Sequence, residues 1–465
     1  MALMPVTDSM FLLAEAREHP MHVGGLQLFE LPEGAGPDYV SEFHRELLSL
    51  ADVRPLFRRR PRGPVGTLGQ FAWSNDDNLD LEYHVRLSGL PRPGRVRELL
   101  ELTSRLHGYL LDRHRPLWEF TVIDGVQGNR FATYSKIHHS LLDGVSALRL
   151  IQSSLSEDPS DMGVRPPWSP RVRTNVFDKP RRSDAPDPFT AVGRLVKDVA
   201  GLGGAAAKVV NEAFREQSAT LAFQAPKSMF NVPITGARRF AAQGWPLERI
   251  KAVGRAASAT MNDVMLAMCS GALRSYMLDL GALPDRPLVA AIPMSLRARS
   301  GGSSSSSSSE SSLGGNAIGL ILCNMATDEP DAAVRLATIH DSMLKGKQVY
   351  HGMSRLQILA LSAIPLIPLA VGTVPGMTTL TPPGFNVLIS NVPGPREPLY
   401  WNGARMQGVY PLSIPYEGQA LNITVTSYAG SLEFGLTGCR RTVPHLQRLL
   451  TFLEESLQDL EKATA

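Results

Sequence analysis

Apolar and polar positions alternate regularly over much of the first 155 residues. Thr7 and Asp8 can cap a helix, and the apolar run Met10–Ala14 follows them, which predicts a short helix over about Ser9–Glu18. The alternation from Met21 to Leu31 is typical of a strand. Apolar residues between Val96 and Leu110 recur mostly at spacings of three and four, which predicts an amphipathic helix. The chain therefore opens with mixed helices and strands.

A predicted β-hairpin leads into the most distinctive motif of the chain. Two alternating segments, Trp118–Asp124 and Phe131–Ile137, are separated by a glycine-containing turn. The second segment runs directly into His-His-Ser-Leu-Leu-Asp-Gly at residues 138–144, and a helical pattern follows over Val145–Leu155. We therefore expect the two histidines at a strand end, where polar side chains face a crevice rather than a core.

The pattern divides the chain into two halves of mixed structure. Residues 158–188 are rich in proline among Arg and Asp, which indicates an extended connection, and a helical tract over Phe189–Gln217 predicts a linker helix. Further elements follow from Pro226: helices at 261–280, 332–344 and 443–463, and strands at 288–293, 317–326, 386–390, 408–412, 420–428 and 431–438. We predict an α/β (or α+β) fold with domains at 1–157 and 226–465, joined by residues 158–225.

The composition is that of an ordinary globular protein. Of the 465 residues 43% are hydrophobic and 20% charged, and 47 Lys and Arg against 44 Asp and Glu leave a net charge of +3. Bulk charge therefore indicates no nucleic acid partner. The three cysteines (Cys269, Cys323 and Cys439) lie far apart, which excludes a disulfide framework and a zinc ribbon. With no signal peptide pattern at the start of the sequence, these features predict a cytoplasmic protein.

The chemistry of the motif follows from its residue types. A neutral imidazole, with a pKa near ~6.5, can take a proton from a hydroxyl or thiol and return it to a leaving group, a role open to His138 or His139. Asp143 could orient the ring or the loop. Gly144 could permit a backbone conformation or a close approach that a Cβ would obstruct.

Three other interpretations of the histidines are weaker or less specific. Metal binding is disfavoured because adjacent histidines in a strand point to opposite faces and no further ligand cluster follows, so we predict no metal. A Ser-His-Asp hydrolase is disfavoured because no Gly-x-Ser-x-Gly motif occurs outside a Gly/Ser-rich tract near Ser303–Ser309. The third interpretation is that the pair only completes a strand end. The remaining one is a histidine base that acts on the substrate's own nucleophile.

Several segments together resemble the bacterial wax ester synthase/acyl-CoA:diacylglycerol acyltransferase family. They are HHSLLDG at 138–144, PLWEF at 116–120, Asn262-Asp263, SNVPGP at 390–395, MPVTDSMFLLAE at 4–15, PMHVGGL at 20–26, LEYHVR at 81–86, RRFA at 238–241 and PMSLR at 293–297. The HHxxxDG motif alone would indicate only the wider CoA-dependent acyltransferase superfamily. That superfamily also includes chloramphenicol acetyltransferases and peptide synthetase condensation domains.

The resemblance implies a fold and a reaction. It implies two chloramphenicol-acetyltransferase-like domains with mixed sheets flanked by helices, and an active-site tunnel at their interface. Acyl-CoA would be a co-substrate, a long-chain alcohol or diacylglycerol the acceptor, and no cofactor would be needed. By the same resemblance His139 is the general base in a ternary complex without an acyl-enzyme, His138 has a supporting role, and Asp143 is mainly structural.

Residues outside the motif are candidates for substrate contacts. The reaction needs an oxyanion donor, and Asn262 at a predicted helix start is the first candidate, although Asn262 and Asp263 also suit helix capping. Ser390 and Asn391, at a strand end, are alternative donors. The wall of the substrate pocket is predicted to include Pro116, Leu117 and Trp118.

Two further features suggest contact with lipid. The apolar stretch Leu356–Thr373 is interrupted by Pro365 and Pro368, which disfavours a membrane span. A basic run between Arg54 and Arg62 could be a solvated face or could touch anionic lipid or CoA phosphates. We therefore expect peripheral association with the inner membrane or lipid inclusions. The rival functions are another acyltransferase of the superfamily and a non-catalytic lipid-binding protein.

Overall fold

The computed structural model describes residues 2–63, 71–170, 224–295, 318–350, 358, 361–362, 364–366 and 382–465. Its helices are α1 (Val6–Ala14), α2 (Tyr39–Ser49), α3 (Leu81–His84), α4 (Val96–Gly108), α5 (Gly144–Gln152), α9 (Leu247–Ala256), α10 (Met261–Asp279), α11 (Ala332–Val349) and α14 (Arg448–Ala463), with short 3₁₀ turns at Pro55–Arg58 and Ile364–Leu366. The predicted linker helix, the serine run and most of the apolar stretch at 356–373 lie outside the described residues.

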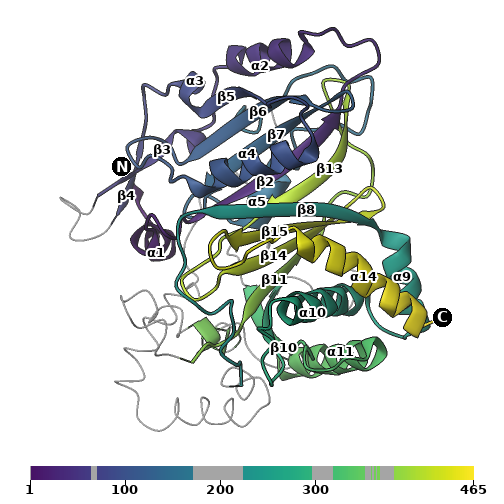
Figure 1. The fold of residues 1–465 in the computed structure, drawn as a ribbon. Helices are drawn as coiled ribbons and strands as arrows, with labels where there is room; N and C mark the ends of the chain where they lie inside the picture. The colour runs from purple at the N-terminus through teal and green to yellow at the C-terminus, as the bar shows by residue number, and fades with distance from the viewer. Residues whose placement is uncertain are drawn as a thin grey trace, which may run out of the picture.

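The strands form two large sheets and one small one (Figure 1). They are β1 (Ala2–Leu3), β2 (His22–Glu30), β3 (Arg59–Arg62), β4 (Ala72–Asn75), β5 (Val85–Gly89), β6 (Trp118–Val126), β7 (Arg130–His138), β8 (Arg238–Pro246), β9 (Val289–Ser295), β10 (Ile318–Asn324), β11 (Val387–Val392), β12 (Tyr400–Trp401), β13 (Ala404–Leu412), β14 (Leu421–Tyr428) and β15 (Ser431–Cys439). The sheet orders are β12-β13-β2-β7-β6-β5, β10-β9-β11-β14-β15-β8 and β1-β4-β3.

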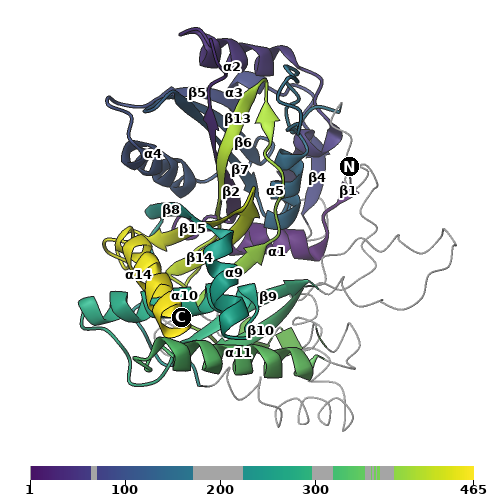
Figure 2. The ribbon, with the colours of Figure 1, turned by 90° about the vertical axis from the view of Figure 1, so that its right-hand side faces the viewer.

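The first large sheet is built on the predicted hairpin. Strands β6 and β7 pair antiparallel, and β2 pairs antiparallel with the other edge of β7. Alternate residues of β7 enter two different cores, with Phe131 and Ile137 on one face and Ala132 and Tyr134 on the other. Helices α4 and α5 cover opposite faces of this sheet (Figure 2).

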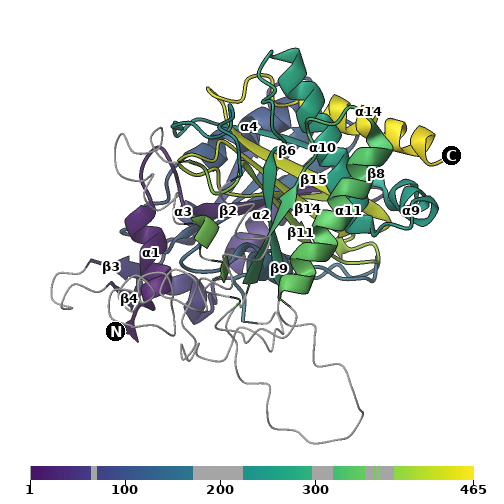
Figure 3. The same cartoon turned by 90° about the horizontal axis from the view of Figure 1, so that it is seen from below.

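The second large sheet carries the C-terminal helices. Helices α10, α11 and α14 pack together over one face, in a core that includes Met268, Leu336 and Leu453 (Figure 3). Helix α1 lies away from these helices, on the side of the molecule that holds β3 and β4. In Figures 1 and 2, α1 lies at the level where the two sheets meet.

The C-terminal half of the sequence contributes two strands to the first sheet, which the predicted domain limits did not include. Strands β12 and β13 come from the C-terminal half of the sequence but extend the first sheet, because β13 pairs with β2. Strand β13 also approaches β15 of the second sheet so closely that a Cβ on Gly435 would overlap the carbonyl oxygen of Pro411. A division into residues 1–157 and 226–465 therefore cuts through the first sheet.

A buried carboxyl group bridges the two sheets at this contact. Glu433 of β15 is 3% exposed and hydrogen-bonds Tyr410 of β13. Burial raises the pKa of Glu433 to about 7, although hydrogen bonds with Ser431 and Tyr410 oppose the shift. The folded protein thus holds this group in its neutral form below neutral pH.

This carboxyl group predicts a pH-dependent loss of stability. The pKa of Glu433 is higher in the folded than in the unfolded chain, so its contribution is complete below about pH 4.5 and is lost as the pH rises through about 7. We expect Glu433→Gln to raise the free energy of unfolding by about 2 kcal/mol more at pH 8.5 than at pH 5.5. Melting temperatures of both proteins at the two pH values test this, and parallel pH curves would contradict it.

Two predicted boundaries change in the structure. Helix α1 begins at Val6 rather than Ser9, ends at Ala14, and has Pro5 as its N-cap with no side-chain capping bond, so the predicted caps Thr7 and Asp8 lie inside it. Part of the proline-rich connection packs into the first half, because Trp168 is buried against Trp118 in the first core. The limits of α1 and the burial of Trp168 depend on packing between segments, and sequence periodicity carries no information about such packing.

Candidate active site

The end of β7 places both histidines between two flanking chain segments. His138 is the last residue of β7, and its N–H donates to the carbonyl of Leu117, 3.0 Å away. The N–H of His139 donates to the carbonyl of Met21 at 2.8 Å. Because these bonds come from opposite sides of β7, the backbone of the pair is held from both neighbouring strands.

The two imidazoles differ in their surroundings. His138 is completely buried, whereas His139 is partly exposed. The ring of His139 stacks on Phe11 of α1, with ring centroids 4.2 Å apart and an interplanar angle of 22°. His139 is therefore the member of the pair whose side chain is open to solvent.

The partners of His138 define its tautomer. The backbone N–H of Ser140 donates to Nδ1 of His138 at 3.1 Å, and the Ser140 hydroxyl lies 2.7 Å from the same atom. Because Nδ1 accepts the backbone N–H, the ring proton of neutral His138 resides on Nε2. Nε2 lies 3.3 Å from a carboxylate oxygen of Glu15. His138 thus links the strand end to the residue that follows α1.

Asp143 holds the loop after the histidines by capping α5. It is the N-cap residue, and its carboxylate accepts the backbone N–H of Ser146 at 2.8 Å and the Ser146 hydroxyl at 3.0 Å. Asp143 therefore fixes the start of α5. The predicted conformational role of Gly144 is wrong, because its φ is not positive and an added Cβ would meet Val23 only at an ordinary 3.8 Å.

Loss of this cap predicts a mainly structural defect. We expect Asp143→Ala to lower the free energy of unfolding by about 1 kcal/mol and to reduce activity largely through the smaller folded fraction. Asp143→Asn, which retains a capping oxygen, should melt close to the wild type. Thermal melting together with activity per folded molecule separates the effects: an unchanged melting temperature with lost activity would indicate a direct role in the reaction.

The candidate oxyanion donors come together from two elements of the second half. Asn262 lies in the first turn of α10, and its Oδ1 accepts a hydrogen bond from Nδ2 of Asn391 in β11 at 3.4 Å. Ser390 precedes Asn391 in the same strand, and all three side chains are partly exposed. The alternative capping role of Asn262 is wrong, because Thr260 is the N-cap.

Asp263 has a structural role at the same helix end. Its backbone N–H and carboxylate form a reciprocal capping box with Thr260, and its Oδ2 also lies 2.8 Å from Nδ1 of His340. The carboxylate is 1% exposed. Asp263 therefore fixes the start of α10, which carries Asn262.

Comparisons with known proteins identify the family. Residues 3–265 match the wax ester synthase/diacylglycerol acyltransferase catalytic domain, and residues 314–461 match the WS/DGAT C-terminal domain. The chain is 53% identical over 465 residues to a probable diacylglycerol O-acyltransferase of Mycobacterium tuberculosis, which covers 100% of this chain and 99% of that protein. The chain belongs to the wax ester synthase/diacylglycerol acyltransferase (WS/DGAT) family. It is therefore an acyltransferase, and the resemblance drawn from its motifs is confirmed.

Other relatives support the assignment and the fold. The O-acyltransferase WSD of Acinetobacter baylyi is 40% identical over 98% of this chain and 96% of that protein. The structure of the wax ester synthase/diacylglycerol acyltransferase from Marinobacter aquaeolei is similar over 100% of both chains, with a TM-score of 0.78 and 41% identity. A condensation domain of the CDA synthetase, 14% identical, shares the fold with a TM-score of 0.55 over 100% of this chain and 97% of that one. The predicted two-part α/β fold is confirmed.

In this WS/DGAT family member, the predicted pocket residues lie in the core. Leu117 and Trp118 are buried and Pro116 precedes them. The indole of Trp118 stacks between His84 and Trp168, with centroid distances of 4.5 and 5.2 Å, and its N–H donates to the carbonyl of Phe57. Their part in a substrate pocket stays a prediction.

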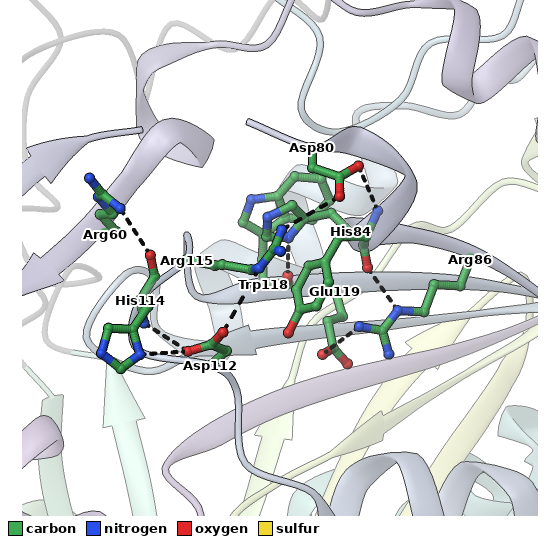
Figure 4. Close-up of polar contacts among 10 residues, drawn as sticks. Arg60, Asp80, His84, Arg86, Asp112, His114, Arg115, Trp118 and Glu119 are labelled. Carbon is green, nitrogen blue, oxygen red and sulfur yellow. Dashed lines mark hydrogen bonds and ion pairs between the residues drawn. The ribbon is translucent and has the colours of Figure 1, made fainter. Parts of the chain in front are cut away.

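The basic run of this protein is divided among several environments. Arg54 is buried, and the guanidinium of Arg58 donates to the carbonyl of Val53. Arg60 reaches the carbonyl of His114 at 3.1 Å (Figure 4). Some of these side chains therefore support the fold, and a lipid or phosphate role for the run stays a prediction.

The carboxylate next to Trp118 forms two ion pairs. Glu119, next to Trp118, contacts Arg86 at 3.2 Å (Figure 4) and the buried Nζ of Lys136 at 2.9 Å. This pairing supports a structural role for Glu119. Among the described residues no group of three or more His, Cys, Asp or Glu has the arrangement of a metal site.

Glu15 and Arg113 are site residues that the sequence analysis did not single out. The side chain of Glu15 is 1% exposed and pairs with Arg113 at 3.0 Å. Burial opposes ionisation of Glu15, but His138, the N–H of Met21 and Arg113 together hold its pKa below the ordinary value. Glu15 is the last residue of the segment MPVTDSMFLLAE, but nothing in the neighbouring sequence indicated that it contacts His138, 123 residues away.

Proposed function

We propose that this enzyme transfers a long-chain fatty acyl group from acyl-CoA to a fatty alcohol or diacylglycerol, with His139 as the general base. The observation that carries the proposal is the position of His139: a partly exposed imidazole whose backbone is fixed at a strand end, next to a buried partner histidine. The names of two relatives support the two acceptor classes: a probable diacylglycerol O-acyltransferase of Mycobacterium tuberculosis and a wax ester synthase/diacylglycerol acyltransferase of Marinobacter aquaeolei.

The proposed reaction proceeds in a ternary complex. His139 takes the proton of the acceptor hydroxyl while the oxygen attacks the thioester carbonyl carbon, which gives a tetrahedral oxyanion. Asn262 is proposed to donate a hydrogen bond to this oxyanion. Collapse breaks the carbon–sulfur bond, and the imidazolium returns its proton to the departing thiolate. The products are an ester and free CoA, and no acyl-enzyme forms.

An assay with a panel of acceptors tests the proposal. The purified protein is given palmitoyl-CoA with hexadecanol, dipalmitoylglycerol or no acceptor, and both free thiol and ester are measured. We expect thiol release that depends on the acceptor, with one ester formed per thiol. Thiol release without ester would indicate a hydrolase, and no release with any acceptor would favour a non-catalytic lipid-binding protein.

We also propose that the enzyme works at a lipid surface. Near the N-terminus Leu3, Met10 and Leu13 are 64%, 37% and 66% exposed, and the last two lie on α1, which brings Phe11 to His139. Exposed apolar side chains next to a site for acyl chains suit contact with a membrane or lipid inclusion. Within the part of the chain that the structure describes, no helix meets the length and hydropathy needed to cross a bilayer. Flotation with phospholipid-coated triolein droplets tests the association.

A further inference from the structure

The carboxylate of Glu15 lies next to His138 and is linked to His139 through one residue, Met21. Its Oε1 accepts the backbone N–H of Met21 at 3.1 Å and lies 3.3 Å from Nε2 of His138. The carbonyl of the same Met21 accepts the N–H of His139 at 2.8 Å. One carboxylate therefore lies against the ring of His138 and is linked to the backbone of His139 through a single residue.

Helix α1 supplies a third contact with the pair. Glu15 is the C-cap residue of α1, and Phe11, one turn earlier, stacks on the ring of His139. The position of Glu15 relative to Phe11 therefore sets where the Phe11 ring meets the imidazole.

Arg113 anchors this helix end. Its guanidinium donates to both the carboxylate of Glu15, at 3.0 and 3.1 Å, and the carbonyl of Leu12, at 2.7 Å. The positive charge lies at the C-terminal end of α1, where it complements the helix dipole. The Glu15 side chain is buried, whereas the side chain of Arg113 is 40% exposed.

We propose that Glu15 is a positioning residue for catalysis, which acts through His138 and Met21 to hold His139 in its reactive place. The inference rests on the proposed function, in which His139 is the general base. A base displaced by about 1 Å can lose on the order of a hundredfold in rate, so a carboxylate that fixes three contacts of the pair should affect turnover more than substrate binding. The carboxylate itself takes no proton from the substrate in this scheme.

Substitutions of Glu15 test the proposal. Glu15→Gln keeps the shape but gives Arg113 an amide in place of a carboxylate, and we expect kcat to fall about 10- to 100-fold with KM for palmitoyl-CoA within about twofold. Glu15→Asp, which keeps the charge, should recover part of kcat. The matched control is Glu18→Gln, because Glu18 is an exposed carboxylate three residues away, and it should behave as the wild type.

A double substitution separates positioning from a general loss of structure. If Glu15 acts mainly through His138, Glu15→Gln should reduce kcat much less in a His138→Gln background than in the wild type. Full additivity would overturn the part of the proposal in which Glu15 acts through His138. The whole proposal would be overturned by a loss in Glu15→Gln that is accounted for by a smaller folded fraction and is not relieved by Glu15→Asp.

The activity of the wild type distinguishes a failure of the proposed function from a failure of the proposed role of Glu15. If the wild type makes no ester from palmitoyl-CoA and any acceptor, the proposed function fails. If the wild type makes ester and Glu15→Gln does so at the same kcat, the role of Glu15 fails and the proposed function stands.

Discussion

Replacing His139 by alanine is expected to reduce ester formation about a thousandfold while the protein remains folded. General bases in enzymes contribute typically 10²- to 10⁴-fold, because they remove a proton as the new bond forms. His139 is partly exposed, and its backbone N–H, which bonds Met21, is unchanged in the variant. The loss should therefore appear in kcat rather than in the melting temperature.

The control for this experiment is another histidine of the first half. The side chain of His114 is 95% exposed and contacts Asp112, so His114→Ala should retain full activity. Acceptor-dependent thiol release from palmitoyl-CoA measures both variants. Turnover of His139→Ala near the wild-type rate, in folded protein, would remove the general-base proposal. A large loss in His114→Ala would show that the assay responds to histidine substitution in general.

Replacing Asn262 by alanine is expected to lower kcat by about 10²- to 10³-fold. Removal of one oxyanion donor has costs of this size, because the negative charge of the intermediate then lacks a preorganised partner. Asn391 donates to Oδ1 of Asn262, which orients the amide and directs its N–H donors away from Asn391. The start of α10 should persist in the variant, since Thr260 and Asp263 form the capping box without Asn262.

Two further variants make this prediction specific. Asn262→Asp has nearly the same shape but places a carboxylate near the developing oxyanion, so it should be at least as inactive as Asn262→Ala. Asn391→Ala should lose less activity, because Asn391 acts by orienting Asn262. Single-turnover rates at saturating palmitoyl-CoA and hexadecanol measure the chemical step. An active Asn262→Asp variant would contradict the oxyanion role.

The local elements of the first half could be predicted because their patterns are strong. Apolar residues alternate along β6 and β7 because successive side chains of a strand face the cores on opposite sides of the sheet. The hairpin places the histidines at a strand end, as expected. Helix α4 likewise follows from the spacing of its apolar residues, although no side chain caps its start. Element limits were less certain, and α14 begins at Arg448 rather than near Val443.

The assembly of the site could not be predicted in the same way. Whether Asn262 caps a helix or faces a substrate depends on a two-residue shift that places Thr260 at the N-cap. The partnership of Asn262 with Asn391 joins residues 129 positions apart. Such contacts depend on how elements pack, and periodicity within one segment carries no information about them.

By itself, the sequence determined several of the strands and helices, that two histidines end a strand, and, through its motifs, the acyltransferase family. Only the tertiary structure decided that β13 joins the first sheet and that Glu15 meets His138. It also decided which histidine is buried and which is partly exposed. The physical reason is range: side-chain periodicity and capping act within a few residues, whereas sheet order, burial and buried ion pairs depend on segments far apart in the chain.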